Sequence, residues 1–184
     1  MDISTKTQQF SDFYEHEVDA LFRYVALRVG NRDEVMDIVQ ETFSALWEKT
    51  VRGDTINIPR ALLYASARNK IIDWYRKKKP LSLEQMTERE EGEKLPFDPV
   101  DTFAESRIIL SIEATQVLTL ITALPSQYRD AVYLRLVEEM LPQEISEVLG
   151  TTAGNVSVRI TRGLALLREQ LGLTPPRQKK HESV

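Results

Sequence analysis

The stretch QEISEVLGTTAGNVSVRITRGLALL, residues 143–167, decides how the C-terminal part of this chain folds. Its residue spacing matches a helix-turn-helix. Ser146 is small where two crossing helices approach most closely, and Gly150 suits a turn residue with positive φ. Val156 and Ile160 are spaced so that both face back onto the first helix. The pattern therefore predicts short helices at about 142–149 and 153–171, joined by a tight turn.

The second of these helices would turn its remaining residues toward solvent. An exposed helix with short polar side chains and arginines can enter a DNA major groove and reach base edges. The residues expected on or near this face are Asn155, Ser157, Val158, Arg159, Thr161 and Arg162. The alternative interpretation is a plain helical hairpin in which Gly150 is only a C-cap.

The rest of the chain also shows helical periodicity, and little of it alternates as a strand would. We expect helices at about 8–29, 33–50, 57–79, 105–122 and 125–138. The pair Gly30-Asn31 is interpreted as the C-cap of the first helix, and Pro59 lies in the first turn of the third. The fold class predicted is all-α.

Residues 80–104 have the composition of a flexible linker, with three prolines and a dense acidic run. They are expected to join two small helical domains, residues 1–79 and 105–172, the second containing the helix-turn-helix. The remaining residues, 173–184, are predicted to be a disordered tail.

Composition limits the classes of function. The chain has 184 residues, a net charge of −4, two histidines and no cysteine. No residue constellation suggests catalysis, a metal site or a cofactor, so an enzyme is not expected. No apolar run approaches the roughly 20 residues that cross a bilayer, which predicts no membrane insertion and a cytoplasmic location.

Charge is segregated along the chain, and this matters more than its total. Residues 60–79 hold seven Lys or Arg against the single acid Asp73, whereas residues 84–105 hold eight acids against two basic residues. Phosphate binding needs local positive charge. Basic and aromatic residues also interleave in the third helix, as in proteins that hold single strands. The alternative is that Trp74 belongs to the core and the lysines form a solvated helix end.

The second helix carries a polar face with Asp37, Gln40, Glu41 and Glu48, beside Trp47. A solvated acidic face is one interpretation. The other is a docking surface for a partner helix, because an acidic and amide-bearing face next to a large aromatic suits protein contacts.

Taken in order, three segments resemble the extracytoplasmic function (ECF) subfamily of the sigma-70 family of bacterial RNA polymerase sigma factors. They are DIVQETF at 37–43, LLYASARNKIIDWYR at 62–76 and LPSQYRDAV at 124–132, ahead of the helix-turn-helix. The resemblance covers about residues 10–171, most of the chain. It implies a factor that binds core polymerase and directs promoter-specific transcription initiation.

The resemblance also implies roles for particular residues. Residues 10–79 are similar to region 2 of the family and residues 105–171 to region 4. Asp37, Gln40, Glu41 and Trp47 correspond to the surface that meets the β′ clamp helices, and region 4 would meet the β flap. Asn69 would capture a flipped base of the −10 element. The other residues that would contact this element are Trp74, Tyr75, Arg76, Lys77, Lys78 and Lys79. The −35 element would be recognised by Asn155, Ser157, Val158, Arg159, Thr161 and Arg162. An anti-sigma factor is a further partner that the resemblance implies, and polymerase-bound factor would be associated with the nucleoid.

Three positions on the second helix of the motif depart from the family pattern. Ser157 and Leu164 stand where basic residues are usual, and Gly163 stands where alanine is usual. These departures affect the −35 sequence that would be read, not the fold.

Two other classes of protein remain as alternatives at this point. A stand-alone helix-turn-helix regulator would shift promoter DNA without polymerase, but it leaves the basic-aromatic third helix without a role. A pure interaction protein, such as an adaptor or an anti-sigma-like bundle, would show no salt-dependent affinity for DNA.

Overall fold

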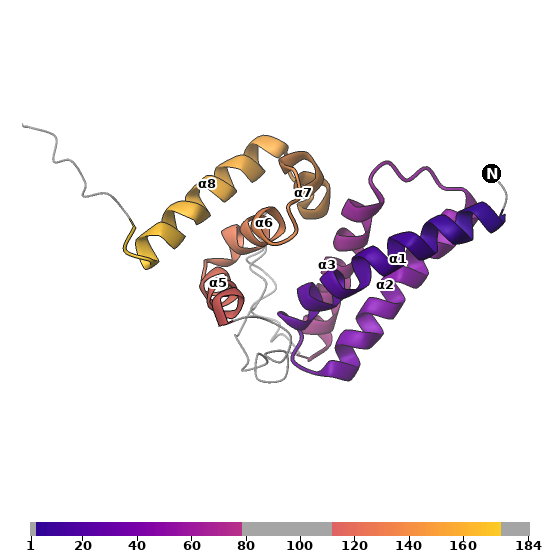
Figure 1. Cartoon of the computed structure of the whole chain (residues 1–184), viewed down its shortest axis with the longest axis horizontal. Coiled ribbons are helices and arrows are strands. Elements are labelled where there is room, and N and C mark those ends of the chain that lie inside the picture. The colour runs from indigo at the N-terminus through magenta and orange to yellow at the C-terminus, as the bar shows by residue number, and fades with distance from the viewer. Residues whose placement is uncertain (1–2, 79–111, 174–184) are drawn as a thin grey trace, which may run out of the picture.

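The computed structural model describes residues 3–78 and 112–173. In these residues every regular element is a helix, so the all-α class is confirmed (Figure 1). An N-terminal unit contains α1 (Ile3–Ala26), α2 (Arg32–Arg52) and α3 (Pro59–Lys78). A C-terminal unit contains α5 (Ile112–Thr122), α6 (Ser126–Leu136), α7 (Pro142–Leu149) and α8 (Ala153–Gln170). The expected linker and the tail beyond residue 173 lie outside the described residues.

The N-terminal unit is a three-helix bundle whose core is aliphatic at the centre and aromatic toward one end. Leu21, Leu63 and Ile71 are fully buried, one from α1 and two from α3. Toward the start of α1, the Phe10 ring lies 4.9 Å from the Trp47 ring of α2, centroid to centroid. Each buried side chain of this size contributes about 1.5–3 kcal/mol, so packing rather than helix propensity holds the bundle.

The C-terminal unit packs α8 closely across α6, with α5 and α7 at its two ends. The close approach requires Gly163. A Cβ built there would overlap the Val132 Cγ2 atom and lie 3.2 Å from the Tyr128 Cβ atom. The departure from alanine at this position therefore has a local structural cause in the neighbouring helix.

Two helix boundaries differ from those predicted. Helix α1 begins at Ile3 and not near residue 8, because Lys6 Nζ donates to the carbonyl of Thr50 at 2.9 Å and fastens the first turn to the end of α2. The interpretation of Gly30-Asn31 as a C-cap is wrong. Asn31 is the N-cap of α2, where its side chain accepts hydrogen bonds from the backbone N–H groups of Asp33 and Glu34.

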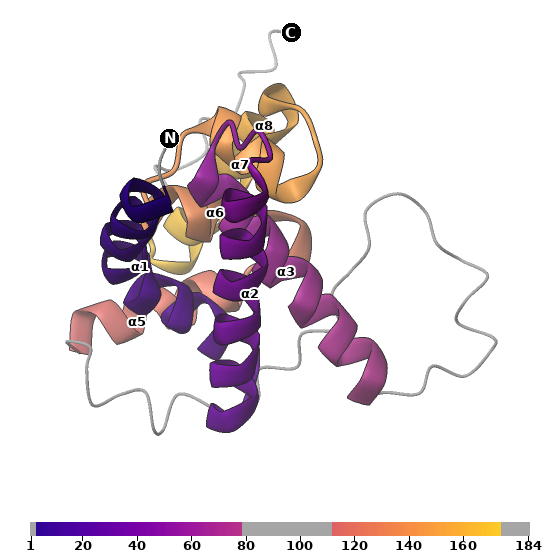
Figure 2. The ribbon, with the colours of Figure 1, turned by 90° about the vertical axis from the view of Figure 1, so that its right-hand side faces the viewer.

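The two units lie against each other. Helix α7 packs on α3, and Figure 1 shows α7 between α3 and α8. The view turned by 90° in Figure 2 places the C-terminal unit behind the N-terminal bundle, in agreement with these contacts. The sequence carried no prediction of this arrangement.

Candidate nucleic-acid interface

Helices α7 and α8 form the predicted helix-turn-helix. Gly150 caps α7 with φ of 62°, a left-handed conformation that glycine adopts without the steric cost of a Cβ. Ser146 is buried, and its Oγ donates to the carbonyl of Gln143 at 2.6 Å. Val156 and Ile160 lie in the core as expected. The plain-hairpin alternative gave no reason for a small residue at 146. In the structure Ser146 is buried, and this burial supplies the reason.

The outer face of α8 presents hydroxyl groups and one exposed apolar side chain. Ser157 Oγ donates to the carbonyl of Ala153, and Thr161 Oγ1 donates to the carbonyl of Ser157, both at 2.9 Å. Because each hydroxyl hydrogen is used inside the helix, the oxygens face outward as acceptors. Val158 lies beside them on the same helix with 48% of its surface exposed.

The other residues predicted for this face are placed as follows. Asn155 and Arg162 are exposed, whereas Arg159 is half-buried. Thr152 caps the start of α8, accepting from the Asn155 backbone N–H at 3.2 Å. The exposed face therefore contains donors, acceptors and an apolar group within the first three turns of one helix.

Helix α3 carries the second predicted face. Asn69 is exposed, as a residue that takes up a base must be. Trp74 is half-buried, and Lys78 Nζ lies 4.5 Å from the centroid of its ring, a cation–π contact. Tyr75 is half-buried too, and its hydroxyl donates to the carbonyl of Arg28. Lys79 lies outside the described residues.

Most of the basic residues of α3 are paired within the protein. Lys70 Nζ lies 2.6 Å from a Glu41 carboxylate oxygen, and Lys78 Nζ lies 3.3 Å from one of Glu34. Arg76 lies 3.4 Å from Asp73, one turn earlier. Lys77 is exposed. The count of basic residues along the chain therefore overstates the free positive charge of this helix.

The polar face of α2 is exposed as predicted. Asp37, Gln40 and Glu41 are all at the surface, and Trp47 is half-buried beneath the Phe10 ring. Met36 lies beside them with 53% of its surface exposed, and no pattern in the sequence had singled it out. An exposed methionine next to carboxylates and an amide is suited to a protein contact.

The sequence interpretation missed a buried set of ion pairs between the two units. Arg28 Nη2 donates to Asp130 Oδ1 at 2.6 Å, and the Arg68 Nε atom is 3.5 Å from Asp130 Oδ2. Burial alone would raise the pKa of Asp130, but the facing Arg28 guanidinium outweighs it and the pKa lies below its usual value. Asp130 is therefore charged in this structure.

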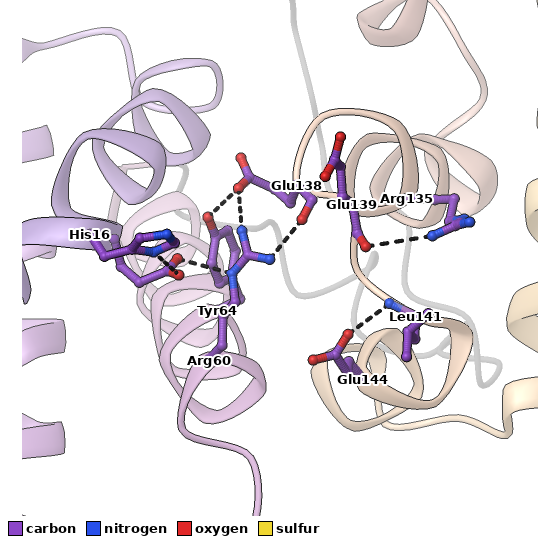
Figure 3. A network of polar contacts seen from close by, with 9 residues as sticks. His16, Arg60, Tyr64, Arg135, Glu138, Glu139, Leu141 and Glu144 are labelled. Atoms are coloured by element: carbon purple, nitrogen blue, oxygen red, sulfur yellow. Dashed lines mark hydrogen bonds and ion pairs between the residues drawn. The ribbon is translucent and has the colours of Figure 1, made fainter. Parts of the chain in front are cut away.

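A second set joins α3 to the turn after α6, as Figure 3 shows. Arg60 donates to Glu17 Oε2 at 3.0 Å and to Glu138 Oε2 at 2.9 Å, and its Nη1 donates to the Glu138 carbonyl at 2.7 Å. The Tyr64 hydroxyl donates to Glu138 Oε2 at 2.7 Å. Burial and the adjacent Glu138 carboxylate raise the pKa of Tyr64, which keeps its hydroxyl a donor.

In the residues that the structure describes, no group of three or more His, Cys, Asp or Glu side chains could hold a metal ion. A search of the same residues finds no helix that is both long and apolar enough to span a membrane.

Two family models match the chain, one over the N-terminal unit and one over the C-terminal unit. The model for sigma-70 region 2 matches residues 13–80, and the model for sigma-70 region 4 matches residues 114–167. The first ends two residues after α3, and the second begins within α5 and ends within α8. The class that the fold and the two faces define is thus a sigma-70 factor.

Curated relatives narrow the class. The ECF RNA polymerase sigma factor SigW of Bacillus subtilis (strain 168) is 32% identical over 168 residues, covering 88% of each chain. The ECF RNA polymerase sigma factor SigE of Mycolicibacterium smegmatis is 25% identical over 165 residues, and the match spans 88% of this chain but 61% of that one. This chain belongs to the ECF RNA polymerase sigma factors. The alternative of a stand-alone regulator is not favoured.

A solved structure shares the fold. The sigma factor RpoE of Bartonella quintana, crystallised with the anti-sigma factor NepR, superposes with a TM-score of 0.64 at 18% identity. The match covers 91% of this chain and 99% of that one. At this level of identity the likeness concerns the architecture, and it confirms the expected helical fold class.

Proposed function

We propose that this sigma factor binds core RNA polymerase through its N-terminal unit and directs initiation by reading −10 and −35 promoter elements with its two units. The observation that carries the proposal is the presence of two exposed reading faces, on α3 and α8, within matches to sigma-70 regions 2 and 4. The protein acts by binding in this scheme and not by catalysis, and it works in the cytoplasm, on the nucleoid when polymerase carries it.

The proposed division of the chain has four parts. Residues 1–79 form a region 2 domain, 80–104 a linker, 105–172 a region 4 domain and 173–184 a tail. The described helices and the two family matches support the first and third parts.

Helix α3 is proposed to take up an unpaired base of the −10 element. Flipping a base out of the stack costs a few kcal/mol, and an amide that hydrogen-bonds the base edge offsets part of that cost. Asn69 is exposed and carries both a donor and an acceptor. Trp74 and Tyr75 would serve as stacking surfaces and Arg76, Lys77, Lys78 and Lys79 as phosphate contacts.

Helix α8 is proposed to read the −35 element through the chemistry of its outer face. The outward oxygens of Ser157 and Thr161 fit the amino groups of adenine or cytosine in the major groove. Val158 fits a thymine methyl group, and Arg162 fits the O6 and N7 atoms of guanine. Asn155 and Arg159 complete the face as contacts to bases or to phosphates.

The acidic face of α2 is proposed to dock on the polymerase β′ clamp helices. Asp37, Gln40 and Glu41 are exposed there, and Trp47, further along the same helix, packs against the Phe10 ring. Region 4 would contact the β flap. An anti-sigma factor is proposed as a further partner, supported by the complex of the Bartonella quintana factor with NepR.

Promoter opening tests the role of Asn69 directly. The full chain is added to core polymerase on promoters selected from a genomic library by run-off transcription, and the melted bases are probed with permanganate. Asn69→Ala should leave core binding intact and reduce permanganate reactivity, because the flipped base loses its hydrogen bonds. Asn57→Ala, the same change at an exposed residue ahead of α3, is the matched control.

Two results would contradict the proposal. Equal reactivity of the Asn69→Ala and Asn57→Ala complexes would remove the role of Asn69. Failure of the unmodified chain to bind core polymerase would remove the function as a whole.

A further inference from the structure

Helices α2 and α3 are bridged twice at the surface by ion pairs, in the order expected of antiparallel helices. Glu41 of α2 pairs with Lys70 of α3 at 2.6 Å. Glu34, earlier on α2, pairs with Lys78, later on α3, at 3.3 Å. Only in the second pair does the lysine also meet an aromatic ring, because the Lys78 Nζ atom lies 4.5 Å from the Trp74 ring centroid. Lys78 is therefore held between a carboxylate of α2 and a ring of its own helix.

The Trp74 ring is enclosed on more than one side. It packs against the hydrophobic core, its centroid lies 4.8 Å from that of the Tyr75 ring, and the Lys78 ammonium lies over it. The packing of α3 fixes the first two contacts, and the Tyr75 hydroxyl is itself bonded to the carbonyl of Arg28. Lys78 can leave without unpacking the helix, because 56% of its side chain is exposed. A base that stacks on Trp74 must therefore displace Lys78.

The strengths of the contacts around the Trp74 ring permit this displacement. A cation–π contact at an exposed site corresponds to about a two- to fivefold change in an equilibrium constant, and a surface ion pair to about fivefold at most. Stacking of a base on an aromatic side chain corresponds to about 5- to 150-fold. A base can therefore take the ring from Lys78, although part of the stacking free energy is lost in doing so. The released ammonium can then bind a phosphate of the same strand.

We propose that Lys78 is a displaceable cover on the Trp74 ring, and that Glu34 is the positioning residue that holds it there. The inference rests on the proposed function, since it concerns how α3 takes up the unpaired −10 strand. A strand that brings a base to Trp74 and a phosphate to Lys78 replaces both of the contacts that it breaks. A duplex keeps its bases stacked on one another, so it offers the phosphate without the base. The cover thus makes stacking on Trp74 depend on a strand that supplies both groups.

The cover can be detected on the free chain by fluorescence. The chain has two tryptophans, so Trp47→Phe leaves Trp74 as the single one. Acrylamide, a neutral quencher, then reports how accessible the ring is. Lys78→Ala removes the cover and Glu34→Gln removes the charge that holds it, so each should increase quenching relative to the Trp47→Phe chain.

Lys77→Ala and Asp33→Asn are the matched controls. Both residues are exposed, and each lies next to the residue with which it is compared. Asp33 and Glu34 are also the two acids in the first turn of α2. The control variants therefore change the charge in the same way and in nearly the same place, while the contact between Glu34 and Lys78 stays intact. Quenching should remain that of the Trp47→Phe chain in both.

Strand binding by the holoenzyme shows what the cover does. The non-template strand of the melted region, from the promoters selected as above, is bound with one abasic site placed at successive positions. The stacked base is the one whose loss weakens binding by the unmodified chain but not by Trp74→Leu. The ratio of affinities for the intact and the abasic strand isolates stacking, because both strands carry the same phosphates. Glu34→Gln should raise this ratio about two- to fivefold, whereas Asp33→Asn should leave it unchanged.

The outcomes separate this inference from the proposed function. Greater quenching and a higher ratio in Glu34→Gln, with neither in Asp33→Asn, support the cover. Equal quenching of Lys78→Ala and Lys77→Ala overturns it, and so does a ratio that Glu34→Gln raises no further than Asp33→Asn does. If no abasic position depends on Trp74, the stacking role of this residue fails and the inference fails with it, while promoter-directed initiation stands. If the unmodified chain does not bind core polymerase, the proposed function fails as a whole, and the role of the cover in strand uptake fails with it.

Discussion

Replacing Gly163 by alanine tests how closely α6 and α8 are fitted. The new methyl group would overlap Val132 Cγ2, a fully buried atom that cannot swing aside as the end of a long side chain could. Overpacking of this kind costs about 1–3 kcal/mol. The higher helix propensity of alanine relative to glycine offsets this loss by about 1 kcal/mol. The net expectation is a loss of about 1 kcal/mol in the free energy of unfolding.

The effect of Gly163→Ala on the free energy of unfolding should reverse its sign when Val132 is replaced by a smaller residue. Val132→Ala alone removes two buried methyl groups and costs about 2 kcal/mol. The space it leaves is the space that the methyl group of Gly163→Ala needs, so in that background the change should stabilise by up to about 1 kcal/mol. The coupling energy between the two sites is therefore expected to be about 2 kcal/mol, large for a pair of residues in contact.

Hydrogen exchange of the full chain, followed on peptides from α6 and α8, measures these differences in the unit concerned. Gly154→Ala is the control, because a Cβ there meets only Oγ1 of Thr152, the N-cap residue of α8, at 3.9 Å. It should be neutral or slightly stabilising in both backgrounds. An equal loss from Gly163→Ala with and without Val132→Ala would refute the steric reasoning.

Three further predictions follow from contacts described above. Replacing one thymine of the −35 element by uracil removes the methyl group of that base. This change should weaken promoter binding a few-fold in the holoenzyme with the unmodified chain, but not in the holoenzyme with Val158→Ala. Equal sensitivity of both holoenzymes would exclude the methyl contact. Burial raises the pKa of Tyr24, Tyr64 and Tyr133 above the ordinary 10, so the stability that they contribute is present below pH 10 and lost as the pH rises beyond it. A titration of absorbance at 295 nm should show these three ionising only as the circular dichroism signal falls, and independent ionisation at pH 10 would contradict their burial. Asn31→Ala should lower the free energy of unfolding by about 1 kcal/mol through loss of the α2 cap, measured by urea denaturation, and an unchanged midpoint would show that the cap contributes nothing.

Local features were predictable from the sequence because their causes are local. The turn at Gly150 and the buried spacing of Val156 and Ile160 depend on residues within about ten positions of one another. The error at Asn31 has a physical origin in the same short range. Asparagine is favoured both after one helix and before the next, and the five-residue connection at 27–31 leaves the two roles indistinguishable by pattern alone.

The contact between the units could not be predicted in this way. Arg28 and Asp130 are 102 positions apart, and Arg60 and Glu138 are 78 apart. Neither pair leaves a periodic signal. The count of basic residues at 60–79 included Arg60 and Arg68, since a count cannot distinguish a cation facing water from one facing a distant carboxylate. The outward residues of α8 were predictable as a face, but the direction of the Ser157 and Thr161 hydroxyl hydrogens was not.

The ion pairs between the two units have an electrical consequence. While Asp130 and Glu138 are in place, they offset much of the positive charge of Arg28, Arg60 and Arg68. Arg60 is also paired with Glu17 of its own unit. Withdrawal of the C-terminal unit would leave a concentrated positive potential on the N-terminal unit, in a molecule whose net charge is −4. The attraction of the N-terminal unit for a polyanion would then increase when the two units part. Added salt would weaken both the ion pairs between the units and the binding of nucleic acid.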